Sequence, residues 1–440
     1  MSTETLRDAG MEILYSNRRG KDFTPPAQKH YDYALFLWDN GLIDFRYAEG
    51  DDPDTARLDF EKLLSTQNKE TGFIPNMTFL GKGQIILDLE RLLVFGPRAR
   101  SSDYSQPPLL AMSALRIHKA FIDQGRPEEA DDFLTTNYDG LASFFRYFKA
   151  RQQGNGQKGE DPKALIDLRD PHESGRDSDE VWDPKKKILG IPLRIPYEKV
   201  PSVLDAPVRR LNGVLDYIGD LKIGVMRRIG KSNFAVADVM FNCIYAENLA
   251  NMAEIAEITN HSDDSQEFRQ RALQTEREVV EKMWDEQDRA FYVQDGGSPI
   301  KKVSVGSLFP LILDTIEPNQ VEGIMAMLED QDMFNTPYPV PSIPVSSPNY
   351  DPAYKEPRLW RGPVWINMNW YIVRGLQKQA ARFKDLDHVI SERAGNLAQH
   401  ITLKTKELVQ KSGYREFYHP HTGEGLRVQD FAWSTLADTL

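Results

Sequence analysis

The sequence predicts an all-α protein with long loops between its helices. In the segments between glycines and prolines, apolar residues recur at three- and four-residue steps, which is the spacing of one face of an α-helix. Strands alternating with helices do not appear, so a doubly wound sheet or a βα barrel is not expected. No fixed repeat is visible, which argues against a regular solenoid. An irregular bundle and a closed ring of helix pairs both fit this periodicity. No flexible linker divides residues 1–440, so we expect a single domain.

The individual helices are predicted from this spacing and from their capping residues. The first begins with Asp54 or Thr55 as its N-cap, and the second follows Pro107 and Pro108 and ends at Gly125. The longest is predicted over residues 234–259, where apolar residues lie on more than one side of the helix. Further helices are expected over residues 127–148, 265–285, 318–330, 363–379 and 385–412. Two long segments, 161–204 and 335–357, are rich in Pro, Asp and Ser, and loops of that length are usually functional or disordered.

The composition excludes several classes of protein. The chain has 54 Lys and Arg against 66 Asp and Glu, and its net charge of −12 opposes a nucleic-acid or anionic-membrane surface. One cysteine and eight histidines exclude a thiolate zinc cluster, and we expect no metal and no cofactor. No apolar run has the roughly 18 residues of a membrane helix, and the N-terminal residues lack the features of a secretory signal. We therefore expect a cytoplasmic protein whose partner is a small molecule. Formation of a homo-oligomer stays an open alternative.

Two acidic motifs carry most of the chemical information. The first runs Glu173-Ser174-Gly175-Arg176-Asp177 within the long acidic loop, where Gly175 permits a sharp turn and an acid beside it can project into a cleft. The second centres on Glu416, which has aromatic residues on both sides and is followed by a Pro-x-Thr-Gly turn. Such surroundings shift the pKa of a carboxyl group and can stack against a sugar ring. On composition alone, a solvated acidic loop is the simpler interpretation of the first motif.

Aromatic and polar residues at other loop-to-helix junctions complete a pattern typical of carbohydrate sites. Trp360, Arg361 and Trp365 precede one helix, Trp38 and Asp39 form a second group, and Gln106 stands before the Pro107-Pro108 helix start. Sugar rings stack on aromatic side chains, whereas sugar hydroxyls need carboxylates and amides. Ordinary core packing would also account for Trp38 and for one or two of the other tryptophans, whereas an arginine between two tryptophans fits the floor of a polar ligand site better.

Together these segments resemble glycoside hydrolase family 63, and especially its compact bacterial branch of mannosylglycerate and glucosylglycerate hydrolases. The resemblance spans about residues 10–440 and rests on Trp38-Asp39, Gly72 to Met77, Ser105 to Pro108, the Glu-Ser-Gly-x-Asp motif, Trp360 to Trp365, and Glu416 to Gly425 with Trp433. It implies an (α/α)6 barrel with long active-site loops and an inverting α-glycosidase that needs no cofactor. It further implies that Asp177 is the general acid and Glu416 the general base, with their carboxyl groups roughly 6.5–9.5 Å apart.

The resemblance also implies a set of residues that bind the substrate: Trp38, Asp39, Gln106, Gly175, Arg210, Trp360, Arg361 and Trp365. An anionic glycerate would want an arginine partner, for which Arg209 and Arg210 are candidates. Several positions depart from the family pattern. His172 replaces an aromatic residue, Arg176 replaces a methionine or leucine, and Leu359 stands where many relatives have tyrosine.

Three functions remain open. The first is hydrolysis of a small α-linked glucoside or mannoside, including the glycerate glycosides. The second is an α-glucosidase for another disaccharide, of the kojibiose or trehalose type. The third, from a different class, is a helical carbohydrate-binding protein without catalysis, although the presence of both acids in complete motifs argues against it.

Overall fold

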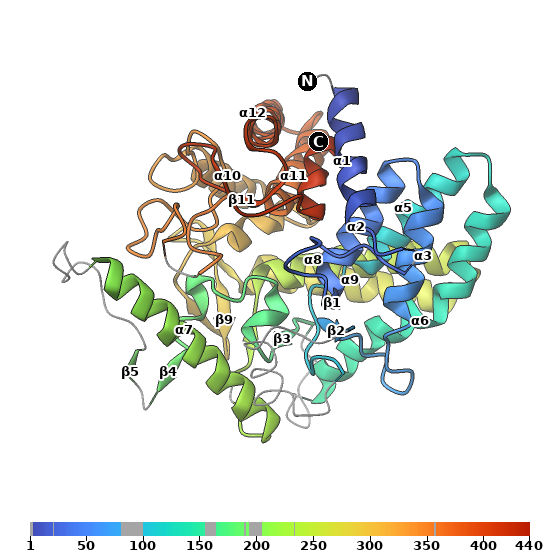
Figure 1. Cartoon of the computed structure of the whole chain (residues 1–440), viewed down its shortest axis with the longest axis horizontal. Helices are drawn as coiled ribbons and strands as arrows, with labels where there is room; N and C mark the ends of the chain where they lie inside the picture. The colour runs from blue at the N-terminus through green and yellow to red at the C-terminus, as the bar shows by residue number, and fades with distance from the viewer. Residues whose placement is uncertain are drawn as a thin grey trace.

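The computed structural model describes residues 3–20, 22–80, 100–154, 164–188, 191–192, 205–232, 234–355 and 358–440. Helices dominate this part of the chain, as Figure 1 shows, and its strands are at most five residues long. The prediction of an all-α fold is confirmed. The α-helices are α1 (Thr3–Asn17), α2 (Leu37–Glu49), α3 (Pro53–Leu64), α5 (Leu110–Asp123), α6 (Pro127–Gly154), α7 (Asp205–Arg228), α8 (Val239–Ile258), α9 (Ser262–Lys282), α10 (Pro318–Glu329), α11 (Ile366–Phe383) and α12 (His388–Ser412).

Short 3₁₀ helices and strands connect these helices. The 3₁₀ helices are η2 (Pro171–Ser174), η3 (Glu180–Trp182), η6 (Val305–Ile312) and η7 (Ala432–Thr439). The strands are β1 (Ala34–Phe36), β2 (Met77–Phe79), β3 (Asp167–Leu168), β4 (Lys187–Ile188), β5 (Ile191–Pro192), β6 (Val236–Ala237), β7 (Trp284–Asp285), β8 (Ala290–Phe291), β9 (Val293–Asp295), β10 (Ser298–Ile300), β11 (Arg415–Tyr418) and β12 (Gly425–Gln429). One antiparallel sheet has the order β10-β9-β6-β3, and β1-β2, β4-β5, β7-β8 and β11-β12 form two-stranded pairs.

The helices form a closed ring of pairs. Its inner wall runs α2, α5, α8, η6, α11, η7, where each element contacts the next and η7 contacts α2 again. Each inner element also packs against an outer helix, in the same order α3, α6, α9, α10, α12 and α1. This is an (α/α)6 barrel, so the ring and not the irregular bundle is the observed architecture. The ring closes where the C-terminal η7 packs on the N-terminal α1, which is why the two ends of the chain lie together in Figure 1.

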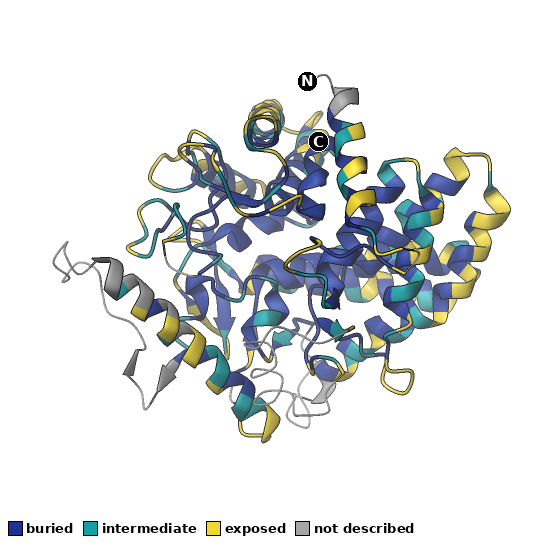
Figure 2. Ribbon diagram, in the orientation of Figure 1, coloured by how far each residue is buried: buried dark blue, intermediate teal, exposed yellow. Residues whose placement is uncertain are grey.

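Burial follows the two layers of the ring. Every residue of η6 is buried, and α8 is buried on most of its circumference, as its apolar sequence predicted. Outer helices such as α9 bury one face and expose the other. Figure 2 shows the result as a dark-blue centre with exposed residues along the outer helices. Among the described helices, none combines the length and apolar character that a membrane-spanning segment requires.

Several predicted boundaries are wrong. The N-cap of α3 is Asp52, whose side chain accepts from the backbone N–H of Thr55 (3.0 Å), and not Asp54 or Thr55. The helix predicted from residue 234 begins at Val239, because residues 236–237 pair as β6 and Asp238 caps the helix. With 28 residues, α6 is the longest helix of the described chain. The helix predicted from residue 363 begins at Ile366, and α1, α2 and α7 were not predicted. Parts of both predicted loops lie outside the described residues.

Candidate active site

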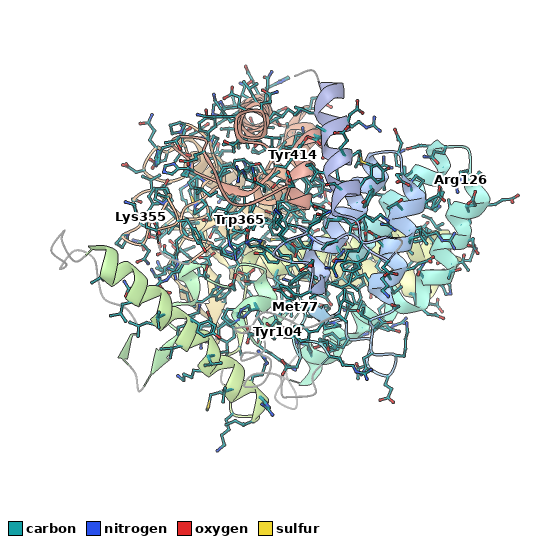
Figure 3. All side chains as sticks on the ribbon, viewed as in Figure 1. Met77, Tyr104, Arg126, Lys355, Trp365 and Tyr414 are labelled. Atoms are coloured by element: carbon teal, nitrogen blue, oxygen red, sulfur yellow. The ribbon has the colours of Figure 1, made fainter. Side chains whose placement is uncertain are left out.

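A cavity of about 230 Å³ lies among loops and strands that join the inner helices. Figure 3 labels Met77 and Trp365, two lining residues near the centre of the molecule. The cavity is lined by Tyr31, Tyr33, Phe36, Asp39, Asn76, Met77, Gln106, His172, Gly175, Asp177, Leu359, Trp360, Trp365, Glu416, Phe431 and Trp433. These residues are far apart in sequence, so closure of the ring is what assembles the cavity. Both predicted catalytic acids, Asp177 and Glu416, lie on its wall.

One carboxylate oxygen of Glu416 is hydrogen-bonded, and the other has no hydrogen-bond partner among the described residues. It stands on β11, which pairs with β12 through a bulge between Arg415 and Phe417, and it is 1 % exposed. Its Oε1 accepts from the Tyr31 hydroxyl (2.8 Å) and from the Arg427 guanidinium. No described residue hydrogen-bonds Oε2, which is buried. A carboxylate that is oriented through Oε1 and has an unpartnered Oε2 retains an acceptor that can take a proton from water.

The charge state of Glu416 reflects two opposing effects. Burial raises its pKa above the ordinary value for glutamate, and the Arg427 cation and the Tyr31 hydroxyl oppose this by stabilising the carboxylate. Arg427 lies on β12 with a left-handed backbone (φ 59°), and it also donates to the Tyr31 hydroxyl (2.6 Å). Tyr31, Arg427 and Glu416 therefore form one triangle of hydrogen bonds at the cavity wall.

Asp177 is positioned by the backbone of its loop. Gly175 ends η2 in the left-handed conformation (φ 73°), which turns the chain so that Asp177 reaches the cavity. Lys186 donates to the backbone carbonyl of Asp177 (3.1 Å). The preceding Arg176 is fully buried and binds Asp179, Asp238 and the hydroxyl of Ser304 (2.8 Å). Because Asp238 and Ser304 cap α8 and η6, this arginine ties the Asp177 loop to two inner helices.

Asp39 brings a third carboxyl group to the same wall. It lies in the first turn of α2 and is 8 % exposed. Burial raises its pKa to about 8, and the nearby charge of Glu416 adds to the effect. At neutral pH, Asp39 is therefore mainly a neutral carboxylic acid that can donate one hydrogen bond and accept others.

Aromatic rings form another side of the cavity. Trp360 and Trp365 stack with centroids 4.0 Å apart and planes 7° from parallel. Trp365 also meets Trp433 edge-on at 5.6 Å. Gln106 lines the cavity as well, and its carbonyl accepts from the backbone N–H of Trp38 (3.0 Å). Flat apolar faces beside carboxyl and amide groups are the surfaces that a sugar ring requires.

The comparisons with known proteins agree with this geometry. A family model described as the mannosylglycerate hydrolase MGH1-like glycoside hydrolase domain matches residues 31–434. The chain belongs to this family. It is therefore a glycoside hydrolase, and the resemblance to glycoside hydrolase family 63 is confirmed.

Two curated relatives extend over nearly the whole chain. The mannosylglycerate hydrolase of Thermus thermophilus is 27 % identical and the match covers 96 % of this chain and 97 % of the relative. The glucosylglycerate hydrolase of Mycolicibacterium hassiacum is 23 % identical, with 95 % and 94 % covered. A crystal structure of the GH63 mannosylglycerate hydrolase from Thermus thermophilus, in complex with Tris and D-glycerate, superposes with a TM-score of 0.77 at 24 % identity, covering 98 % of both chains. That structural likeness shows the barrel fold.

Not every predicted substrate-binding residue of this glycoside hydrolase lies on the cavity. Asp39, Gln106, Gly175, Trp360 and Trp365 line it. The ring of Trp38 instead stacks on Tyr371 at 6.2 Å inside the barrel, where it is buried.

Of the two arginines in the predicted set, Arg361 does not line the cavity, and the side chain of Arg210 is not among the described residues. The guanidinium of Arg361 is fully buried against Asp183 (2.7 and 3.0 Å) and the carbonyl of Ser178 (2.6 Å). Arg361 therefore supports the Asp177 loop from behind the cavity. Arg210 falls within α7, and its side chain lies outside the described residues.

The structure adds residues that the sequence reasoning did not assign. Tyr31 and Arg427 hold Glu416, and His172, Asn76 and Phe431 line the cavity. Among the described residues, no group of three or more His, Cys, Asp or Glu side chains is arranged to hold a metal ion.

Proposed function

We propose that this glycoside hydrolase cleaves an α-glycoside of glycerate with inversion, using Asp177 as general acid and Glu416 as general base. The observation that carries the proposal is that Glu416, whose Oε2 is buried without a described hydrogen-bond partner, lines the same cavity as Asp177. The sugar and the glycerate leaving group are taken from relatives that act on mannosylglycerate and glucosylglycerate.

The reaction follows from the roles of the two carboxyl groups. Asp177 donates its proton to the glycosidic oxygen as the bond to the anomeric carbon breaks. A water on the opposite face of the sugar attacks that carbon while Oε2 of Glu416 takes its proton, so the products are glycerate and the β-anomer of the sugar. The Tyr31 and Arg427 contacts keep Glu416 oriented and favour its ionised form, which a base requires.

The remaining wall supplies substrate binding. Trp360 and Trp365 offer apolar faces to the sugar ring, and Asp39 and Gln106 offer hydrogen-bonding groups to its hydroxyls. The cavity volume of about 230 Å³ suits a small glycoside better than a branched oligosaccharide.

The test is release of sugar from mannosylglycerate, glucosylglycerate, kojibiose, trehalose and nigerose, with NMR reading the anomer that forms first. Release of the β-anomer from a glycerate glycoside is expected. Asp177→Asn and Glu416→Gln should each lower kcat by about 10²- to 10⁴-fold. Glu424→Gln is the matched control, because Glu424 is exposed on the turn after Glu416.

Each other outcome removes part of the proposal. The α-anomer as first product would contradict inversion, and normal activity in either acid variant would remove that residue's assigned role. Cleavage of kojibiose or trehalose alone would support the disaccharide α-glucosidase, and binding of sugar without any cleavage would support a carbohydrate-binding protein.

A further inference from the structure

The charged residues on the cavity wall are unevenly distributed. Asp39, Asp177 and Glu416 are acidic, and His172 is the one basic residue among the described residues that line the cavity. A glycerate leaving group carries a carboxylate, which an ionised Glu416 in the same cavity would repel unless a cation faces it. The described wall therefore has a single candidate for that cation.

His172 is held rigidly through one ring nitrogen. Its Nδ1 and its backbone N–H both bind Oδ1 of Asp170, at 2.7 and 3.1 Å. Asp170 is buried and is also paired with Arg227. The imidazole stacks on Tyr104, with centroids 5.5 Å apart, and Arg227 covers the same tyrosine at 4.6 Å. The backbone carbonyl of Tyr104 accepts from the backbone N–H of Asn76 (2.7 Å), a residue that lines the cavity. With Nδ1 engaged, Nε2 is the nitrogen left to serve a ligand.

The surroundings keep this imidazole protonated. Burial alone would lower the pKa of His172, but the hydrogen bond and charge of Asp170 outweigh it, and Asp177 and Asp220 add to the effect, so the pKa is raised to about 10. At neutral pH, His172 is a cation with a donor N–H at Nε2.

The position of His172 fixes which part of a substrate it meets. It lies five residues before Asp177 on the same loop, both residues line the cavity, and the Asp177 carboxyl is near enough to contribute to the raised pKa of His172. A general acid stands beside the leaving oxygen, whereas the base and its water stand on the opposite face of the sugar. His172 is therefore on the leaving-group side, and the Tyr31–Arg427–Glu416 triangle is on the water side.

We propose that the His172 imidazolium binds the carboxylate of the leaving group through Nε2–H and selects an anionic leaving group over a neutral one. This inference rests on the proposed function and names the residue that sets its specificity. The Asp170 contact on Nδ1 plays the orienting part, since it fixes the direction in which Nε2–H points. A charge-assisted hydrogen bond of this kind is strong and directional.

The experiment compares two substrates that differ only in that carboxylate. The glycerate glycoside that the wild type cleaves is set against the glycerol glycoside of the same sugar, in which a neutral CH₂OH replaces the carboxylate. His172→Gln removes the charge, and His172→Phe keeps a ring to stack on Tyr104. Each variant should lose about 10- to 100-fold in kcat/KM on the acidic substrate and change little on the neutral one. Equal losses on both substrates, or no loss, would overturn the proposal.

A control variant and a binding measurement distinguish a loss of substrate specificity from misfolding and from failure of the proposed function. His118→Gln is the matched control, because His118 also pairs with an aspartate (Asp131, 3.4 Å) but does not line this cavity. Calorimetry on the wild type, which needs no variant, should show tighter binding of D-glycerate than of glycerol, and equal binding would overturn the inference. If the protein cleaves neither glycoside, that result contradicts the proposed function but leaves the role of His172 to be decided by binding. In that case, loss of D-glycerate binding in His172→Gln would still support the role of His172, and unchanged binding would refute it.

Discussion

The two catalytic acids are held in different ways. Glu416 is fixed by direct contacts to its carboxylate, from Tyr31 and from the Arg427 cation. The contacts described for Asp177 reach its backbone, and the adjacent Arg176 points away into the barrel wall toward Asp179 and Asp238. A base must stay ionised, so a cation on its carboxylate helps it. An acid must carry a proton, so a directly paired cation would work against it.

The two arginines beside these acids therefore have different tasks. Arg427 is 31 % exposed and acts on the charge of Glu416, whereas Arg176 is fully buried and anchors a loop to α8 and η6. Replacing Arg427 should change activity more than stability, and replacing Arg176 should change stability more than the pH profile. The predictions below test this contrast.

The largest effect is expected for Arg176→Met, which removes the guanidinium and keeps an unbranched side chain. It leaves Asp179 and Asp238 buried without their cation, and the free energy of unfolding should fall by about 3–5 kcal/mol. Burial already raises the pKa of both aspartates, and losing the arginine raises them further. The variant should thus regain part of its stability as pH falls and the carboxyl groups become protonated. Denaturant unfolding at pH 5 and pH 7 measures both effects.

Arg126→Met is the matched control for this prediction. Arg126 also binds two acids, Asp54 (2.7 Å) and Glu129 (2.6 Å), but all three side chains are substantially exposed. Its loss should cost less than about 1 kcal/mol. Equal costs for Arg126→Met and Arg176→Met would refute the anchoring role of the buried cluster.

The sequence revealed most of the long helices of the barrel, but it missed α1 and α2 and the short inner elements η6 and η7. Helical periodicity needs several turns, so α8, α11 and α12 were predicted, whereas η6 and η7 have eight residues each and η6 contains Pro310. Both are inner elements of the ring, which is why periodicity alone could not distinguish a closed barrel from a bundle. The resemblance to a known family supplied that choice.

The sequence motifs predicted the two acids that line the cavity. The prediction failed where a residue adjacent in sequence to a lining residue was assumed to line the cavity as well. Trp38 and Asp39 are adjacent on α2, and successive helical residues point about 100° apart, so only Asp39 faces the cavity. Arg361 likewise turns away from the cavity that its neighbour Trp360 lines. The contact of Tyr31 with Glu416 spans 385 positions and arises from ring closure, for which a single sequence gives no signal.

The second prediction concerns Arg427→Met and the water side of the cavity. Without the guanidinium, the pKa of Glu416 should rise further above its ordinary value, so less of the base is ionised at neutral pH. The expected loss in kcat at pH 7 is about 10- to 100-fold, partly recovered as pH rises. A pH–rate profile whose acid limb moves to higher pH would confirm the role.

Arg393→Met serves as the control for this variant, because Arg393 pairs with Glu329 (2.5 Å) on the outer helices and does not line the cavity. It should leave the pH–rate profile unchanged. An Arg427→Met variant with reduced kcat but an unmoved acid limb would show that Arg427 acts only on structure.

The smallest effect is expected for Asp39→Asn, and it tests the charge state of the third carboxyl group. Because the folded pKa of Asp39 is about 8 and the ordinary value is near 4, the folded state holds this proton more tightly than the unfolded state. Its contribution to stability is therefore lost as pH rises toward 8, at no more than about 1.4 kcal/mol per pH unit. Asparagine does not titrate. The free energy of unfolding of the variant, relative to that of the wild type, should therefore increase by about 1.4 kcal/mol between pH 7 and pH 9, with most of the increase below pH 8. Denaturant unfolding of both proteins at pH 7, 8 and 9 measures this difference, in which the contributions of the other titrating groups cancel. A constant difference across that range would mean that Asp39 is already ionised at pH 7 and adds a negative charge to the cavity.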